Sequence, residues 1–335
     1  MKKIIIFGAT GKVGNYVVDY MRDFFKNGDF EIIASGRRVE DCSKILGVKY
    51  YPVDITEYSS FDKLPQKDIH AVISLAAQLP TKSDGQNTHI QLMTNTIGTG
   101  NILEYCKNVG ADRFLFTQTV FDLGNNLNKN IVLKEGWTPN FSYTDDHAVY
   151  VIAKNAAIEL MEHYYQKYGL KKFVFRLPTI YAYNAWPYMY KDGEKVMRPV
   201  YKLINKAINS EKIEIWGDPN YSKDMVHVYD FAQMLCKAIL VDRNKGIYNV
   251  GTGKPITLEE QIRTIVDVFS PKDNPSIIGY RPDLKSGGGC KMDIRNSIEE
   301  LGYIPRYFCR DIFENFKKEM ALNRFYKIRS DEKYQ

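Results

Sequence analysis

The sequence lacks the features of a metal-binding, disulfide-rich or membrane-embedded protein. Its 335 residues include only five cysteines and five histidines. The cysteines form no C-x-x-C pair and have no neighbouring histidine at metal-ligand spacing, which argues against a zinc site and a disulfide scaffold. No apolar run is long enough to span a membrane, and the run that ends at Gly8 is too short for the core of a signal peptide. We therefore expect reduced thiols, no metal and a cytoplasmic protein.

Blocks of basic residues are also absent, although the formal net charge is +6. A scattered excess of Lys and Arg favours a solvated surface of mixed charge over a nucleic-acid interface, and it suits an anionic ligand such as a nucleotide. The length exceeds that of a typical compact domain, so we expect a main domain with a smaller second lobe.

What the sequence does contain is a short apolar run followed by a glycine-rich turn. Residues 2–7 read as a strand, and Gly8-Ala9-Thr10-Gly11-Lys12-Val13-Gly14 leads into a helical pattern. Glycines permit positive φ and close backbone approach, while the free N–H groups at a helix start attract phosphate. The turn predicts a cradle for a dinucleotide phosphate, although strand–glycine–helix turns also occur without a ligand.

Apolar strands and helical segments alternate through the first half of the chain. The strands are expected at 30–35, 48–53, 69–75, 113–117 and 172–177, with long helices at 88–109 and 146–168. Short, nearly continuous apolar strands separated by helices indicate a parallel sheet covered on both faces. The expected fold class is α/β, a doubly wound parallel sheet of the Rossmann type.

Beyond Pro178 the sequence changes to loops rich in aromatic residues and proline. We expect helices at 197–209, 230–241, 257–269, 294–301 and 309–322, and strands at 212–216, 225–229 and 246–250. The predicted division is a dinucleotide-binding domain over 1–180, with return segments near 212–250, and a smaller mixed α/β C-terminal lobe over 181–325. Such a lobe would close over the ligand crevice and select the substrate.

Tyr150 and Lys154 form the second chemical signal. A Tyr and a Lys four residues apart share a helix face, so the ammonium can stabilise a phenolate that exchanges a proton with a substrate alcohol. The same spacing recurs at Tyr168 and Lys172, but Gly169 indicates a helix end between them. Thr119 directly follows the strand at 113–117, where its hydroxyl can bond the same substrate oxygen. A surface position for Tyr150 and a backbone-capping role for Thr119 stay open on this pattern alone.

Taken in order, these segments resemble the extended short-chain dehydrogenase/reductase family, and within it the NAD(P)-dependent nucleotide-sugar epimerases, dehydratases and reductases. The resemblance covers roughly residues 3–305. It is carried by the glycine-rich turn, the Tyr150–Lys154 pair and the segments at 54–56, 75–77, 95–104, 113–119, 175–181, 224–230, 248–251 and 301–305.

The resemblance implies roles for individual residues. Tyr150 would be the general acid/base, Lys154 would hold the nicotinamide ribose and lower the pKa of the tyrosine, and Thr119 would take the place of the catalytic Ser or Thr. The implied reaction core is hydride transfer between a sugar carbon and nicotinamide, coupled to proton transfer. Cofactor contacts are implied for Gly8, Thr10, Gly11, Lys12, Val13, Gly14, Asp54, Ile55, Leu75, Ala76, Ala77, Pro178 and Ile180, besides Tyr150 and Lys154.

Ser35, Arg37 and Arg38 stand where NAD-preferring relatives carry an acidic residue for the ribose 2′-hydroxyl. Two guanidiniums and a serine suit a 2′-phosphate, which arginine grips bidentately. We therefore favour NADP over NAD. In the alternative reading the two arginines stack on adenine or point to solvent.

The two residues after Thr119 narrow the reaction type. The 4,6-dehydratases of this group resemble one another in an Asp-Glu pair after the catalytic threonine, whereas this chain has Val120 and Phe121. This favours an epimerase or a keto-sugar reductase over a dehydratase. Lys223 and Arg281 match positions that contact the sugar diphosphate in relatives, although surface roles are as plausible for each taken singly.

Two other function classes stay open: an NADPH-dependent reductase of a non-sugar carbonyl, and a non-catalytic NAD(P)-sensing protein of the same fold. A sensor needs no proton shuttle, so the set of Thr119, Tyr150 and Lys154 argues for an enzyme. In relatives the helices at 88–109 and 146–168 often form a dimer interface, so the resemblance implies a homodimer. A nucleotide sugar is the expected partner, with neither nucleic acid nor membrane.

Overall fold

A seven-stranded parallel sheet forms the centre of the computed structural model, which describes residues 1–80, 88–191, 194–285 and 289–329. Its order is β14-β7-β5-β4-β1-β2-β3, and every neighbouring pair is parallel. The strands are β1 (Lys2–Phe7), β2 (Phe30–Gly36), β3 (Lys49–Pro52), β4 (Ile69–Ser74), β5 (Arg113–Thr119), β7 (Lys171–Leu177) and β14 (Lys245–Asn249). The chain reverses its direction of travel across the sheet between β1 and β4. This is the doubly wound fold predicted from the sequence, with its ligand crevice expected at that reversal.

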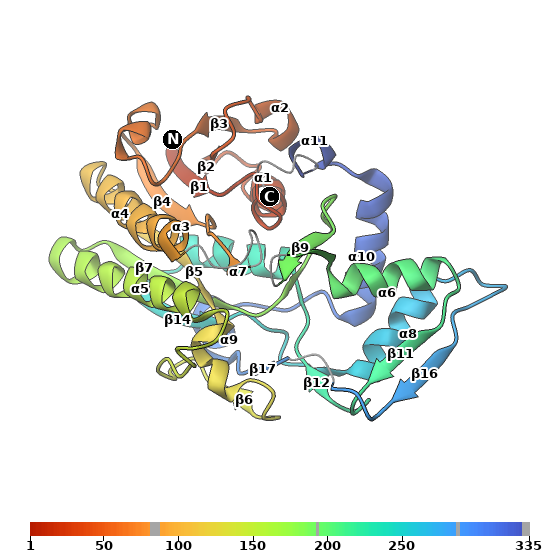
Figure 1. Ribbon diagram of the computed structural model, residues 1–335. Helices are drawn as coiled ribbons and strands as arrows, with labels where there is room; N and C mark the ends of the chain where they lie inside the picture. The colour runs from red at the N-terminus through yellow and green to blue at the C-terminus, as the bar shows by residue number, and fades with distance from the viewer. Residues whose placement is uncertain (81–87, 192–193, 286–288, 330–335) are drawn as a thin grey trace.

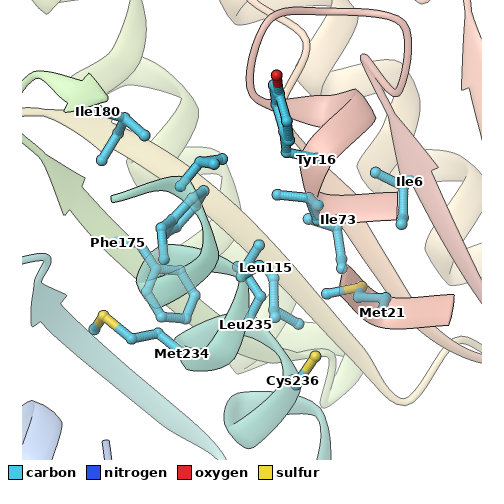
Figure 2. Packing of buried hydrophobic residues seen from close by; sticks show 14 of the residues in the cluster. Ile6, Tyr16, Met21, Ile73, Leu115, Phe175, Ile180, Met234, Leu235 and Cys236 are labelled. Carbon is cyan, nitrogen blue, oxygen red and sulfur yellow. The ribbon is translucent and has the colours of Figure 1, made fainter. Parts of the chain in front are cut away.

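Helices cover both faces of the sheet because its strands are apolar on both sides. On one face lie α1 (Gly14–Phe24) and α7 (Val228–Leu240), and Figure 2 shows Met21 and Leu235 from these helices packed near Ile6, Ile73 and Leu115 of the sheet. On the other face lie α4 (Gly98–Asn108) and α5 (Ala148–Tyr168). Short helical segments connect the strands: α2 (Ser43–Leu46), η1 (Tyr58–Lys63) and η4 (Val120–Asn126).

The long helix expected over 88–109 is not a regular α-helix over its whole length. It consists of α3 (Thr88–Leu92), a π-helical segment η3 (Met93–Ile97) and α4. Within the π-helical segment, the Asn95 side chain exchanges two hydrogen bonds of 2.9 Å with the backbone of Gln78. These two hydrogen bonds connect the helix to the loop after β4.

A smaller group of elements in the C-terminal half of the chain packs around a separate hydrophobic cluster that includes Tyr201, Ile262 and Phe313. Its helices are α6 (Pro199–Ile208), α8 (Leu258–Phe269) and α10 (Cys309–Leu322), with α9 (Arg295–Leu301) packed near α7 and β14. The short strand pairs outside the main sheet are β9 (Tyr188–Lys191) with β10 (Glu194–Met197), β11 (Ile213–Trp216) with β16 (Ile278–Arg281), β12 (Ser222–Lys223) with β15 (Ile256–Thr257), β8 (Ile180–Tyr181) with β13 (Val226–His227), and β6 (Val132–Leu133) with β17 (Lys291–Met292). The bounds of the helices α6, α8, α9 and α10 agree closely with those predicted from the sequence.

The predicted boundary between a strand at 225–229 and a helix at 230–241 is wrong by two residues. The strand β13 ends at His227, whose Nδ1 accepts a hydrogen bond from the backbone N–H of Tyr229 at 3.2 Å. This side chain caps the helix start, so α7 begins at Val228.

The end of the chain returns to the N-terminal half. After α10, Asn323 adopts a left-handed φ of 45°, and the short helix α11 (Tyr326–Arg329) lies beside α1 (Figure 1). Phe325 and Ile328 join the same hydrophobic cluster as α1 and α7. The sequence did not predict this element, and the lobe expected over 181–325 stopped short of it. Across the described residues, no helix combines the length and apolar character required to cross a bilayer.

Candidate active site

The glycine-rich turn is held in a shape that side chains would disrupt. Gly8 has a φ of +79°, and a Cβ built there would lie 2.6 Å from the backbone nitrogen of Ala76. A Cβ on Gly14 would lie 2.1 Å from the carbonyl oxygen of Gly8. The turn therefore packs directly against the loop after β4 and against itself, so both positions require glycine.

A cavity of about 370 Å³ lies on one side of this turn, at the ends of β1, β2, β3 and β4; we call it the adenosine-side cavity. Predicted cofactor residues line it: Gly8, Thr10, Gly11, Arg37, Arg38, Asp54, Ile55, Leu75, Ala76 and Ala77. The structure thus brings together segments that are up to about seventy residues apart in sequence.

The three residues expected near a 2′-phosphate have different positions. Arg37 is exposed and lines the adenosine-side cavity. Arg38 lines the same cavity, but one of its Nη atoms donates to the carbonyl of Ile328 at 2.9 Å. Ser35 is fully buried in β2 and is not among the described residues that line the cavity, so the expectation for this serine is wrong. Its hydroxyl oxygen is buried and has no hydrogen-bond partner among the described residues.

A second cavity of about 540 Å³ lies on the other side of the turn; we call it the sugar-side cavity. It is lined by Lys12, Val13 and Gly14 of the turn, Thr119, Tyr150, Pro178 and Ile180, and by the aromatic residues Trp186, Tyr188 and Tyr190. The expected acid/base tyrosine and the expected threonine therefore share one cavity with the glycine-rich turn. Part of the aromatic stretch forms its wall.

Thr119 is the last residue of β5, and its Oγ1 accepts a hydrogen bond from the backbone N–H of Phe121 at 3.2 Å. The Thr119 hydroxyl thus caps the following turn, which is the backbone-capping role that the sequence left open for this residue. A hydroxyl that accepts one bond still has its own hydrogen to donate. Capping and substrate contact are therefore compatible at this residue.

Tyr150 and Lys154 lie one turn apart on α5, and both are buried. Burial raises the pKa of the Tyr150 phenol and lowers the pKa of Lys154 to about 7. The Lys154 ammonium lies 3.8 Å from the centroid of the Phe116 ring, and Lys154 is not among the described lining residues of either cavity. Burial is the cause of both shifts, so the lowering of the tyrosine pKa by Lys154 that the resemblance implies stays a prediction.

The similar Tyr-x-x-x-Lys pair is separated by the chain, as expected. Tyr168 ends α5, Gly169 has a φ of +71°, and Lys172 lies in β7, where it forms an ion pair with Glu162. This pair has no part in either cavity.

Lys223 and Arg281, predicted to contact a sugar diphosphate, are not among the described residues that line the two cavities. Arg281 lies on β16 in an exposed ion pair with Asp283, at 2.7 Å between Nη2 and Oδ2. Lys223 lies in β12, before the buried Asp224. Their predicted contact stays a prediction.

Sequence reasoning missed three residues of the sugar-side cavity that carry chemistry: His147, Arg198 and Arg329. His147 stacks on Phe121 with a centroid separation of 3.8 Å, and its Nδ1 lies 3.5 Å from Asp145 Oδ1. His147 could have been identified from the sequence, because it lies three residues before Tyr150 on the same helix face. Arg198 and Arg329 carry no local motif.

Comparison with known proteins places the chain in a family. The model of the NAD dependent epimerase/dehydratase family matches residues 4–251. A putative UDP-glucose 4-epimerase of Methanocaldococcus jannaschii is 24% identical over 330 residues, covering 94% of this chain and 96% of the relative. A UDP-glucuronate 4-epimerase of Thermodesulfobacterium geofontis is 24% identical over 298 residues, covering 84% and 85%.

Solved structures agree on the fold. The structure of a UDP-glucose 4-epimerase with UDP-glucose from Thermotoga maritima has a TM-score of 0.73 at 21% identity, covering 96% of this chain and 99% of that chain. A UDP-glucuronic acid 4-epimerase from Bacillus cereus in complex with NAD has a TM-score of 0.71 at 18% identity, covering 95% and 96%. The family match spans most of the chain, so the protein belongs to the NAD dependent epimerase/dehydratase family and is an enzyme of the extended short-chain dehydrogenase type.

Proposed function

We propose that this enzyme is an NAD(P)-dependent epimerase of a nucleotide-diphosphate sugar, with Tyr150 as the general acid/base. The observation that carries the proposal is that Thr119, Tyr150 and the glycine-rich turn line one cavity. The named activities of the relatives from M. jannaschii and T. geofontis support the substrate class.

The two cavities suit a dinucleotide. They share Gly8, Gly11, Leu75 and Ala77, so they meet at the glycine-rich turn, whose shape a Cβ on Gly8 or Gly14 would disrupt. The adenosine side would be held by Asp54, Ile55 and Ala76, and the nicotinamide side by Pro178 and Ile180. When bound, the nicotinamide supplies a hydride acceptor that becomes the hydride donor of the return step.

Proton transfer is assigned to the side chains of the sugar-side cavity. Thr119 donates its hydroxyl hydrogen to the reacting sugar oxygen, while Tyr150 takes the proton from that oxygen and returns it after the keto intermediate has turned over. Lys154, one helical turn later, supports the ribose and the phenolate; for this its ammonium has to leave the Phe116 ring. Burial raises the pKa of the Tyr150 phenol, so the Lys154 ammonium would have to approach the phenol to stabilise the phenolate that takes this proton.

Epimerisation is favoured over dehydration by the surroundings of Thr119. Val120 and Phe121 supply no acid, and the nearest carboxylate, Asp122, is 1% exposed and accepts two hydrogen bonds of 3.0 Å from Arg176 Nε. A carboxylate committed to a buried arginine is not available as an additional acid/base group. A reductase remains the runner-up, and net consumption of reduced cofactor distinguishes it.

NADP is the cofactor form that we propose. Arg37 lines the adenosine-side cavity and is exposed, so it is placed to contact a 2′-phosphate, whereas Arg38 is partly engaged by Ile328. The affinities of the wild type and Arg37→Ala for NADP and NAD test this. We expect at least about a tenfold loss for NADP and little change for NAD, because a charge-assisted contact is removed. An NAD preference that the substitution leaves unchanged would end the NADP assignment.

A homodimer through α4 and α5 is also proposed. Ile97 directly precedes α4 and Ile152 lies on α5, and both are among the exposed large apolar residues. Light scattering on the purified protein is expected to give twice the mass of 38.7 kDa. The cytoplasmic location stays a prediction.

The experiment that tests the activity is incubation with UDP-, GDP-, CDP- and dTDP-sugars and each cofactor, followed by mass spectrometry and NMR. The expected product is an isomer of one sugar, with unchanged mass and no net cofactor consumption. Net consumption of NADPH would replace the epimerase by a reductase. Cofactor binding without any sugar conversion would replace it by a sensing protein.

A further inference from the structure

Arg329, on the short helix α11, lies where the two cavities join. The residues common to both linings are Gly8, Gly11, Leu75, Ala77 and Arg329. A dinucleotide that occupies both cavities has its nucleosides on either side of this junction and its pyrophosphate at the junction itself. Arg329 is therefore the one cationic residue, among the described residues, shared by both cavity linings at the position of the pyrophosphate.

The guanidinium of Arg329 connects the glycine-rich turn to Asn184 across the junction. Its Nη1 donates to the carbonyl of Thr10 in the glycine-rich turn at 3.3 Å, and its Nε donates to Oδ1 of Asn184 at 3.1 Å. The side chain is 7% exposed. A planar guanidinium presents its N–H donors in a fixed fork, a geometry that suits phosphate oxygens.

Packing against α1 fixes the segment that carries Arg329. Phe325 meets the Tyr16 ring at a centroid separation of 5.0 Å, and Ile328 is buried in the same hydrophobic cluster. Arg324 forms ion pairs of 2.9 Å with Asp19 of α1 and with Glu319 of α10. The last described turn of the chain is thereby bound to the helix that begins at the glycine-rich turn.

Two further cations lie close to Arg329 in the sugar-side cavity. Lys12 donates to the carbonyl of Ile180 at 3.3 Å, and Arg198 has a buried Nε without a hydrogen-bond partner among the described residues. Burial, reinforced by the charges of Arg198 and Arg329, lowers the pKa of Lys12 to about 7. The described lining of this cavity includes no Asp or Glu. Such a wall favours a ligand group with two negative charges.

We propose that Arg329 binds the pyrophosphate of the dinucleotide together with Lys12, and that α11 thereby holds the bound cofactor in place. The inference rests on the proposed function only in that a dinucleotide occupies the two cavities. It assigns the retention of the cofactor to α11, since release requires Arg329 to leave both the pyrophosphate and the glycine-rich turn. Slow release suits an epimerase, which reuses one cofactor molecule in each turnover.

The test measures ligand binding by the full-length protein in the absence of sugar. Arg329→Gln and Arg329→Lys are compared with Arg310→Gln, which removes an exposed arginine of α10 that forms an ion pair with Asp267. The ligands are NADP, NAD, adenosine and UDP, with dissociation rates measured for the dinucleotides. Thermal unfolding without ligand verifies that each variant is folded.

The expected result is a dinucleotide dissociation rate about ten- to a hundredfold higher in Arg329→Gln, because a charge-assisted contact is lost. Arg329→Lys should lie between this variant and the wild type, Arg310→Gln should match the wild type, and adenosine affinity should stay within about twofold. Unchanged dinucleotide binding in a folded Arg329→Gln would overturn the inference. So would a loss of UDP affinity alone, which would assign Arg329 to a sugar diphosphate.

Failure of the proposed function gives a different result. A wild-type protein that binds neither dinucleotide contradicts the proposed function itself. A wild-type protein that binds one of them, with an equal dissociation rate in Arg329→Gln, contradicts only the role of Arg329.

Discussion

The two cavities on either side of the glycine-rich turn are built in different ways. The adenosine-side cavity is mainly lined by short runs at the ends of β1, β2, β3 and β4, each recognisable from its own sequence. The sugar-side cavity combines Thr119 and Tyr150 with an aromatic loop, with Arg198 before α6 and with Arg329 near the chain end. Local motifs therefore define the cofactor half, whereas tertiary packing supplies most of the charge on the sugar half.

The largest expected effect is at the centre of the sugar-side cavity. Tyr150→Phe removes the hydroxyl that we propose as the acid/base group, so turnover should fall by about 10²- to 10⁴-fold while the affinity for NADP stays within about twofold. Tyr168→Phe is the matched control, because Tyr168 has the same sequence spacing to a lysine but ends α5 away from both cavities. Equal activities of the two variants would remove Tyr150 from the mechanism.

A smaller effect is expected in the turn that separates the cavities. In Gly14→Ala the new Cβ would lie 2.1 Å from the Gly8 carbonyl oxygen, so the turn has to shift. We expect a loss of about 1–3 kcal/mol in the free energy of unfolding and weaker binding of both NADP and NAD, measured by chemical denaturation and calorimetry. Gly136→Ala is the control, since a Cβ there meets nothing within 4 Å. Normal cofactor affinity in Gly14→Ala would show that the turn does not hold the phosphates.

The pH dependence of binding sharpens the comparison further, because Lys12 has a pKa of about 7 in the sugar-side cavity. A bound pyrophosphate stabilises the charged lysine and raises its pKa, so binding takes up a proton above about pH 7. Dinucleotide affinity should therefore fall as the pH rises from 7 to 9, by at most about tenfold per pH unit for this group.

Calorimetry in buffers of different ionisation enthalpy measures this proton uptake directly. Lys12→Arg should reduce it, since arginine stays charged throughout this range. Lys154 also has a pKa of about 7, so we assign to Lys154 any proton uptake that remains in Lys12→Arg. Uptake that is identical in the wild type and Lys12→Arg would exclude a contact between Lys12 and the phosphates.

The smallest expected effect lies outside both cavities. If Arg281 contacts the sugar diphosphate, Arg281→Ala should raise KM and leave kcat unchanged. We expect a rise of only about two- to fivefold, because the guanidinium has to leave its ion pair with Asp283, and exposed pairs and contacts of this kind contribute little. Steady-state kinetics on the converted sugar measure both constants. A fall in kcat alone would contradict the diphosphate role.

Most of the fold was predictable from the sequence because its elements have strong local signals. The long helix that contains Tyr150 was expected over 146–168 and is observed over Ala148–Tyr168, and Gly169 ends it as predicted. The positions of Thr119 and Tyr150 in one cavity agree with the rule that ligands bind at the carboxyl ends of parallel strands.

The features that the sequence could not show depend on burial and on distant contacts. Arg329 contacts Thr10 across 319 residues, and no pattern in either segment indicates this contact. Ser35 is fully buried in β2, and the Lys154 ammonium lies against the Phe116 ring, where burial dominates the pKa values of both Tyr150 and Lys154. In each of these cases the packing of the surrounding residues decides where the functional group lies.

The most direct test of the central claim tracks one hydride through the reaction. A nucleotide sugar that carries deuterium at the oxidised carbon is converted by the cofactor-loaded enzyme, and NMR and mass spectrometry locate the label. The account predicts an epimeric sugar of unchanged mass, with the deuterium returned to the same carbon. A keto-sugar that accumulates with its deuterium left on the cofactor, or a dehydrated product, would contradict it.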